Sequence, residues 1–253
     1  SVTAALVTKV VENTSTKSNY RNQDQNFKMY VNPYIRITPF KGLTWESRVN
    51  GTLTYSKNNS FQGVGSYNAV KAGNNWETDS KAVITQNRNY NYKWENILTY
   101  NFTIANDHDF TVTAVTSWNH NQTDNTQMTG IGIKNNKTLW TDLGNAVTMQ
   151  NSSSYTMSKG MGYIGRLNYS YLGKYLFSAS VRHDGSSRLA DGHKWSTFPA
   201  VSLGWRISEE SFMENTKDWL DNLKLRVSYG ETGTAAIQPY SSVSSLAQGM
   251  FTL

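Results

Sequence analysis

The chain has 253 residues, a formal net charge of +6 and no cysteine. These values exclude a disulfide framework, a cysteine-ligated zinc site and a cysteine nucleophile, and without a cluster of lysine and arginine they argue against nucleic-acid binding. Aromatic residues make up 13% of the chain and charged residues only 17%, whereas disordered chains are poor in aromatics and rich in charge. No apolar run reaches the length of a membrane-spanning helix.

Strict alternation of apolar and polar residues is the main signal, and it predicts strands with two unlike faces. Between residues 43 and 56, for example, the odd positions include Leu43, Val49 and Leu53, whereas every even position is polar. We predict eight strands, at residues 31–38, 43–56, 90–104, 110–118, 163–171, 175–181, 201–207 and 223–229, with residues 2–11 a candidate ninth.

The lengths of the strands and of their connections favour a membrane barrel over a soluble sandwich. Several strands approach the roughly 9–11 tilted residues that cross a bilayer, rather than the usual 5–6. Short connections at residues 41–42, 106–108 and 173–174 alternate with long ones at 57–89, 121–161 and 184–195. Outer-membrane barrels have short periplasmic turns and long outer loops, so we expect the long connections and the segment after Gly230 to lie outside.

The connection at residues 208–221 departs mildly from this alternation. Its first residues, Ser208, Glu209 and Glu210, are typical of a helix N-cap followed by an acidic first turn. We predict a short helix here on the periplasmic side.

Five runs between residues 162 and 241 carry a family resemblance. They are Arg182-His183-Asp184-Gly185-Ser186-Ser187-Arg188, Lys194-Trp195, Phe198-Pro199-Ala200-Val201-Ser202-Leu203-Gly204-Trp205-Arg206-Ile207-Ser208-Glu209-Glu210, Trp219-Leu220-Asp221-Asn222-Leu223-Lys224-Leu225-Arg226 and Ser228-Tyr229-Gly230. This region resembles the SusC/RagA family of TonB-dependent outer-membrane transporters of Bacteroidetes. Leu189 departs from the phenylalanine expected after Arg188. The resemblance continues more weakly through Asn32-Pro33-Tyr34, Lys41-Gly42-Leu43 and Trp94-Glu95-Asn96.

The resemblance implies an antiparallel transmembrane β-barrel of about 22 strands in the bacterial outer membrane, surrounding an N-terminal plug. It also implies a SusD-like lipoprotein partner and a TonB complex that acts through the plug. Residues 1–253 have the pattern of part of the barrel domain, with the plug and the C-terminal barrel strands absent. We also find no signal peptide at residue 1.

The basic side chains of the polar rows are the first candidate functional residues. Those predicted to face the lumen are Arg36, Arg48, Arg166, Arg182, Arg206 and Arg226, accompanied by Lys93 and Lys224 and opposed by Glu46 and Glu95. They provide a path for an anionic substrate, or they bond to water, to one another or to a plug. The second interpretation is favoured because such interiors are polar in general.

Aromatic residues in the long outer loops are the second set. Phe61, Tyr67, Trp76 and Trp140 are candidates for stacking on sugars or holding apolar peptide side chains, and equally for pinning the loops together. His183 and His193 lie near Asp184 and Asp191, but their spacing is not that of a metal site. We predict no metal, no cofactor and no catalytic residue.

Three functional hypotheses follow. The leading one is TonB-dependent uptake of an oligosaccharide or a peptide, with membrane lipids around the barrel and a SusD-like lipoprotein as partner. The second is a surface-binding or adhesin-like β protein that translocates nothing. The third is an enzyme barrel such as an outer-membrane protease or lipase, and we predict that the chain is not an enzyme.

Overall fold

The structure is a computed structural model that describes residues 2–13, 20–64, 80–216, 218–233 and 239–240. The strands are β1 (Val2–Asn13), β2 (Tyr20–Val31), β3 (Tyr34–Phe40), β4 (Leu43–Gln62), β5 (Lys81–Ile104), β6 (His108–Ile131), β7 (Thr148–Tyr171), β8 (Tyr175–Ser186), β9 (Trp195–Arg206) and β10 (Lys224–Gly230). The described residues also form three short 3-10 helices: η1 (Leu143–Asn145), η2 (Ile207–Glu209) and η3 (Ser211–Thr216). None of the described helices is long and apolar enough to cross a membrane.

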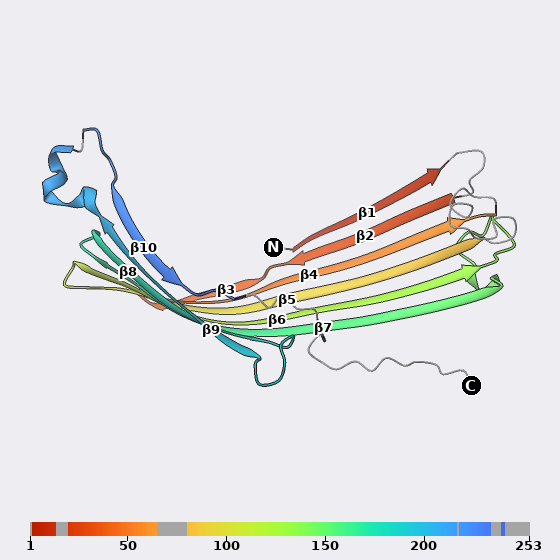
Figure 1. The fold of residues 1–253 in the computed structure, drawn as a ribbon. Coiled ribbons are helices and arrows are strands. Elements are labelled where there is room, and N and C mark those ends of the chain that lie inside the picture. Colours follow the sequence, from red (N-terminus) through yellow and green to blue (C-terminus); the bar gives the residue numbers. More distant parts are fainter. Residues whose placement is uncertain (1, 14–19, 65–79, 217, 234–238, 241–253) are drawn as a thin grey trace. The chain divides into compact units, whose positions relative to one another are not determined.

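The described strands form one sheet with nearly sequential pairing. Its order is β1-β2-β4-β5-β6-β7-β8-β9-β10, and β3 also pairs with β4 (Figure 1). β2 pairs with residues 51–62 of β4, and β3 with residues 43–48. β2 and β3 thus share one partner and are separated at Asn32-Pro33. Proline has no N–H to donate to a ladder, but its carbonyl accepts a hydrogen bond from the Val49 amide at 3.0 Å.

The short hairpin turns lie where the sequence predicts them. Gly42 has a φ of +90°, and a Cβ at this position would collide with the carbonyl oxygen of Asn101. The two other turns have positive φ at consecutive residues, at Ala105 and Asn106 and at Leu172 and Gly173. Paired positive φ values are typical of the turns whose twist matches that of a two-stranded hairpin.

One predicted strand has the wrong bounds, and one strand was largely missed. The first predicted strand, at residues 31–38, is in fact the end of β2, a break at Asn32-Pro33 and β3, and most of β2 was missed. Residues 20–26 are polar on both faces, so they show no alternation, although they pair with residues 56–62 of β4.

The predicted long connections are also too long. β4 continues to Gln62 and β5 begins at Lys81, while β6 continues to Ile131 and β7 begins at Thr148. The connection predicted at 184–195 is reduced to residues 187–194. The added strand residues are mostly Asn, Ser, Thr and Gln on both faces, which is the composition of a loop. Hydrogen bonding between neighbouring strands, rather than side-chain polarity, makes them strands.

The predicted helix at 208–221 is present only as the two 3-10 helices η2 and η3. Ser208 is not the N-cap: Arg206 occupies that position, without a side-chain capping bond. Ser208 is instead buried, and its amide donates to the Leu223 carbonyl at 3.2 Å. Glu210 ends η2 and uses its carboxylate for contacts with β8 and β9.

The chain divides into two compact units. The first contains residues 1–32, 50–92 and 121–157. It holds a small hydrophobic core of Phe61, Ala82, Ile133 and Leu143, surrounded by the partly buried Ile84, Met128, Leu139, Trp140 and Ala146. The Ser80 hydroxyl donates to the Ile133 carbonyl at 2.7 Å, and the Gly132 amide donates to the Ser80 carbonyl at 2.7 Å. These two bonds fix the beginning of the 132–147 connection to the start of β5.

The second unit contains residues 33–49, 93–120 and 158–253. The buried hydrophobic side chains of the described residues all lie in the first unit, and the apolar row of the second is exposed. Leu203 is 59% exposed, Leu225 54% and Val227 65%. Leu43 and Val49 are half-buried. The apolar face of this unit therefore has no second sheet packed on it among the described residues.

The two faces of the second unit differ in chemistry, as the alternation predicts. One face carries an apolar depression lined by Tyr169, Tyr175, Leu176, Phe177, Leu203, Gly204, Trp205, Leu225 and Val227. A second depression on the same strands is lined by both polar and apolar residues, and its polar side chains include Arg166, Asn168, Ser178, Ser202, Lys224, Arg226 and Ser228. Successive residues of a strand point to opposite faces, so one set of strands supplies both surfaces.

Aromatic rings form a continuous row at the end of the second unit that carries the hairpin turns. The contacts, by ring centroid, are Phe40–Tyr100 (6.1 Å), Tyr100–Phe102 (5.0 Å), Phe102–Phe110 (5.0 Å), Phe110–Tyr169 (4.8 Å), His108–Tyr169 (5.9 Å), His108–Tyr171 (4.7 Å) and Tyr171–Tyr175 (6.2 Å). Farther along the same strands lie the contacts Trp94–Trp118 (4.9 Å), Tyr163–Trp195 (6.1 Å) and His183–Trp195 (4.7 Å). Two aromatic bands separated by aliphatic residues are typical of the two interfaces of a membrane barrel.

Replacing Leu167 with arginine tests this assignment of the faces. Leu167 lies on β7 between Tyr163 and Tyr171 and pairs with Ala179 of β8. Hydrocarbon offers a charge neither water nor a counter-ion, so we expect the free energy of unfolding of the full-length protein in lipid vesicles to fall by about 2–4 kcal/mol. Denaturant titration measures this loss.

The matched control is Asn168→Arg, at the neighbouring position on the polar face. We expect this variant to unfold almost as the unmodified protein does. Equal losses for the two variants would contradict the assigned faces.

Candidate functional site

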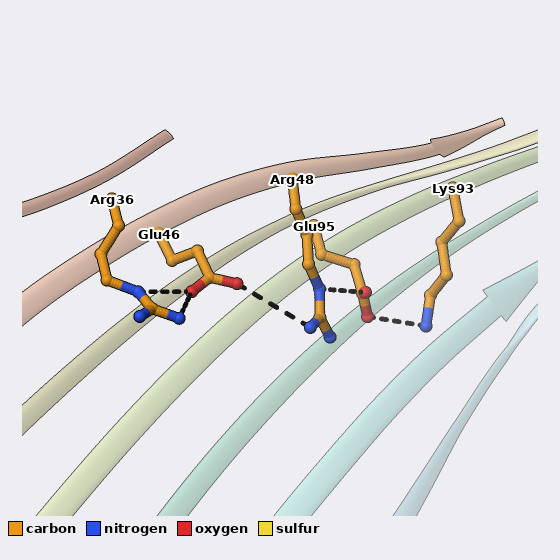
Figure 2. A network of polar contacts seen from close by, with 5 residues as sticks. All are labelled: Arg36, Glu46, Arg48, Lys93 and Glu95. Atoms are coloured by element: carbon orange, nitrogen blue, oxygen red, sulfur yellow. Dashed lines mark hydrogen bonds and ion pairs between the residues drawn. The ribbon is translucent and has the colours of Figure 1, made fainter. Parts of the chain in front are cut away.

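A chain of five charged side chains crosses three strands on the polar face of the second unit (Figure 2). Arg36 of β3 is 2.6 Å from Glu46 of β4. Arg48, also on β4, lies 3.8 Å from Glu46 and 3.0 Å from Glu95 of β5. Lys93 closes the network at 2.7 Å from Glu95. Cations and anions alternate, and each carboxylate lies between two cations.

The two carboxylates are the buried members of this network. The side chains of Glu46 and Glu95 are 13% and 10% exposed, whereas those of Arg36, Arg48 and Lys93 are 59%, 43% and 52% exposed. A carboxylate removed from water is costly unless it is paired and hydrogen bonded. The three cations therefore stabilise the two anions, and one positive charge remains uncompensated within the network.

Two other predicted lumen-facing arginines are also engaged. Arg182 Nε is 2.5 Å from Asp184 Oδ2 on the same strand. Arg206 Nη1 donates a weak hydrogen bond of 3.4 Å to the Gly173 carbonyl at the neighbouring hairpin turn. These contacts agree with the interpretation that part of the basic set bonds within the protein.

The remaining basic residues form a group of a different kind. Arg166 of β7 and Lys224 and Arg226 of β10 line the second depression, of about 650 Å³, together with Asp109. Among the described residues, none of the three cations has a carboxylate within ion-pair distance. These three positive charges therefore have no balancing carboxylate among the described residues, and they border the depression over β7–β10.

The aromatic loop candidates have different positions. Phe61 is not in a loop but near the end of β4, where its ring is 1% exposed and belongs to the small hydrophobic core. Trp140 lies in the 132–147 connection and packs against that core while staying partly exposed. Tyr67 and Trp76 lie outside the described residues. Phe61 and Trp140 are thus brought into one cluster, with the indole at its margin.

Sequence reasoning missed the partners that build this cluster. Ile133 and Leu143 come from the 132–147 connection, and Ser80 and Ala82 from the start of β5. A usable signal was present at Gly132: its φ is +77°, and a Cβ there would lie 2.9 Å from the Val147 side chain. This glycine lets the chain leave β6 and return toward β7.

The histidines do not form a metal site in the described residues. No group of three His, Cys, Asp or Glu side chains is arranged to hold a metal ion there. His183 instead stacks on Trp195 and shares a hydrogen bond of 2.8 Å with the Thr197 hydroxyl. Asp191 pairs with Lys194 at 2.5 Å, and the hydrogen bond from this lysine lowers the pKa of the Asp191 carboxyl.

Comparison with known proteins identifies the family of this two-faced sheet. Residues 6–249 match the family described as TonB dependent receptor-like, beta-barrel. The chain belongs to this family. It is 32% identical over 222 residues to TonB-dependent receptor P26 of Formosa agariphila, which covers 87% of this chain. It is also 49% identical over 73 residues, 29% of this chain, to TonB-dependent receptor SusC of Bacteroides thetaiotaomicron.

Solved structures confirm the fold. The chain resembles the RagAB peptide transporter with a TM-score of 0.74 at 21% identity, over 87% of this chain and 24% of that one. The predicted fold class, an antiparallel transmembrane β-barrel represented in part, is therefore confirmed, as are the family resemblance and the location in the bacterial outer membrane. Receptors of this family are not enzymes.

The chain spans only part of the length of its curated relatives. It covers 22% of TonB-dependent receptors P26 and P39 of Formosa agariphila, and its match to SusC covers 7% of that protein.

A Phe61→Ala variant tests whether this ring supports the 132–147 connection. Removing a buried phenylalanine leaves a cavity, so we expect the small core to lose about 3–5 kcal/mol. Hydrogen exchange at the amides of residues 132–147 in the full-length protein reads out this loss as faster exchange. Val147→Ala is the control, because Val147 is 73% exposed and its truncation leaves no cavity. Unchanged exchange in the Phe61 variant would show that the ring is not structural.

Proposed function

We propose that this chain forms part of the barrel wall of an outer-membrane transporter that imports an oligosaccharide or a peptide. The observation that carries the proposal is the sheet with an exposed apolar face and an opposite face of paired and unpaired charges, in a chain of the TonB-dependent receptor family. A barrel with this polarity isolates a hydrated interior from lipid. Uptake is energised by the TonB complex, and a SusD-like surface lipoprotein captures the substrate.

The inner face supports a preference for substrates with carboxylate groups. Arg36, Arg48 and Arg182 are compensated by nearby carboxylates, whereas Arg166, Lys224 and Arg226 have none among the described residues. Uncompensated cations in a cleft concentrate anions and raise their rate of association. We assign to these three residues the contact with an acidic substrate, and to Arg36, Arg48, Arg182 and Arg206 the stabilisation of the wall.

The outer connections supply the other proposed contacts. Trp140 is held at the margin of the small core, so its exposed edge is available to a sugar face or an apolar peptide side chain. Tyr67 and Trp76 are proposed to contact the substrate as well, and Phe61 to support Trp140 through the small core. Aromatic rings on a fixed support bind at a lower entropic cost than rings on a free loop.

Energised uptake separates transport from surface binding. We expect cells that carry the full-length receptor to accumulate a fluorescent oligopeptide or oligosaccharide only when TonB is functional. The alternative, an adhesin-like protein, predicts cell-surface binding that is unchanged by loss of TonB and is never followed by accumulation. Comparing the two probes decides between peptide and glycan, and internal fluorescence after removal of surface label is the measurement.

A triple variant, Arg166→Gln with Lys224→Gln and Arg226→Gln, tests the proposed anionic path in the same cells. We expect uptake of an acidic peptide to fall while uptake of a neutral peptide of equal length is kept. The control variant Arg206→Gln removes an arginine that already bonds to a backbone carbonyl, and it should leave the ratio of the two rates unchanged. An equal fall for acidic and neutral peptides in the triple variant would contradict the path.

A further inference from the structure

The connection between β9 and β10 is held at the same end of the second unit as the hairpin turns. The Arg206 amide donates to the Lys174 carbonyl at 2.8 Å, and the Ser208 amide donates to the Leu223 carbonyl at 3.2 Å. Figure 1 shows the 3-10 helices η2 and η3 of this connection between the ends of β9 and β10. In outer-membrane barrels the end with short turns faces the periplasm.

Glu210 fixes this connection to the apolar face of the sheet. Its Oε1 accepts hydrogen bonds from the Tyr175 hydroxyl at 2.6 Å and from the Trp205 indole N–H at 3.0 Å, while Lys174 Nζ lies 3.4 Å from Oε2. Tyr175 and Trp205 both line the apolar depression, so the carboxylate lies on the lipid side. The bond from Tyr175, then that from Trp205, lowers the pKa of the Glu210 carboxyl, with a smaller contribution from Lys174.

The attachment point coincides with the end of the aromatic row described above. Tyr175 is the last ring of that row, 6.2 Å from Tyr171, and it is also the donor to Glu210. The connection therefore begins where the row on β3–β8 stops. Two of its own aromatic residues are unusually exposed: Phe212 at 65% and Trp219 at 74%. Large apolar rings are rarely left in water when a bilayer interface adjoins them.

Charge on this connection indicates which lipid it meets. By sequence this connection carries four acidic residues against one lysine, Lys217. Glu209, Glu214 and Asp218 are exposed, whereas the Glu210 carboxylate is hydrogen bonded to Tyr175 and Trp205 and lies 3.4 Å from the ammonium of Lys174. Exposed carboxylates repel anionic headgroups and are attracted to the ammonium group of a zwitterionic phospholipid.

We propose that the β9–β10 connection, through its described residues 207–216 and 218–220, forms an interfacial anchor that lies in the headgroup layer of the periplasmic leaflet, with Phe212 and Trp219 inserted among zwitterionic phospholipids and Glu210 holding the segment on the lipid side. The anchor extends the aromatic band over β9 and β10, where the sheet itself supplies fewer rings. This inference concerns the membrane and does not depend on which substrate the receptor imports.

Spin labels placed in the full-length receptor test the anchor. These 253 residues contain no cysteine, and any cysteine in the rest of the full-length receptor is replaced first. A spin label can then be attached to a single cysteine introduced at Phe212 or at Trp219. In vesicles of phosphatidylethanolamine and phosphatidylcholine, we expect labels at both sites to collide more with oxygen, which partitions into lipid, than with a water-soluble nickel chelate. Their collision ratio should approach that of a label at the lipid-facing Leu203.

A label at Glu214, which is exposed on η3, is the matched control and should show the ratio of a residue in water. Labels at Phe212 and Trp219 that behave like the one at Glu214 would overturn the proposal. Vesicles containing phosphatidylglycerol should give a smaller shift toward lipid, and a larger shift would overturn the assignment of the headgroup.

The role of Glu210 is tested with the same labels. Glu210→Ala removes the acceptor for Tyr175 and Trp205 and should shift the labels at Phe212 and Trp219 toward water, whereas Glu210→Gln keeps one acceptor oxygen and should restore most of the lipid contact. If the variant were simply misfolded, the collision ratio of the label at Leu203 would change as well. Labels that keep their lipid contact in Glu210→Ala would show that this carboxylate does not hold the anchor.

Discussion

The absence of water in the hydrocarbon of a bilayer is the constraint on which this structure depends. Backbone N–H and C=O groups in that layer must bond to one another, and neighbouring strands provide those bonds. The chain meets the constraint with sequentially paired strands joined by turns whose residues adopt positive φ at Gly42, Asn106 and Gly173. Once neighbouring strands are hydrogen bonded to each other, the period of two along each strand directs apolar side chains to lipid and polar ones to the interior.

The same period explains how much of the fold could be predicted from the sequence. Within the second unit, the alternating rows gave the strands, their faces and the short turns, because lipid on one side and water on the other impose different chemistry. Residues 20–26 of β2 and the strand residues of β4–β7 that were predicted as loops are mostly polar on both faces. Only their pairing therefore distinguishes them from loops. Phe61 was placed in a loop for this reason, although it lies in β4 and is buried.

The candidate site was predictable as a set of residues but not as a set of contacts. The alternation placed Arg36, Arg48 and Arg166 on one face, but it did not show which of them have an anionic partner. Arg36 meets Glu46 because the two are register partners on β3 and β4, whereas Arg48 meets Glu95 from 47 positions away. From the sequence, Glu210 was predicted to lie in the acidic first turn of a helix. Its three donors come from Lys174, Tyr175 and Trp205, and no spacing in the sequence relates all three to it.

The small core around Phe61 gives the first unit packing of its own. Its four buried side chains come from β4, β5 and the 132–147 connection, so they are ordered by their own packing. Regions with independent packing open at their own free energy, below that of global unfolding. Within the 132–147 connection, Ile133 and Leu143 contribute to this core and Gly132 requires its positive φ, so we expect substitutions at the exposed positions between them to be tolerated best. The sequence of this connection can therefore change during evolution without altering the residues on which the folding of the sheet depends.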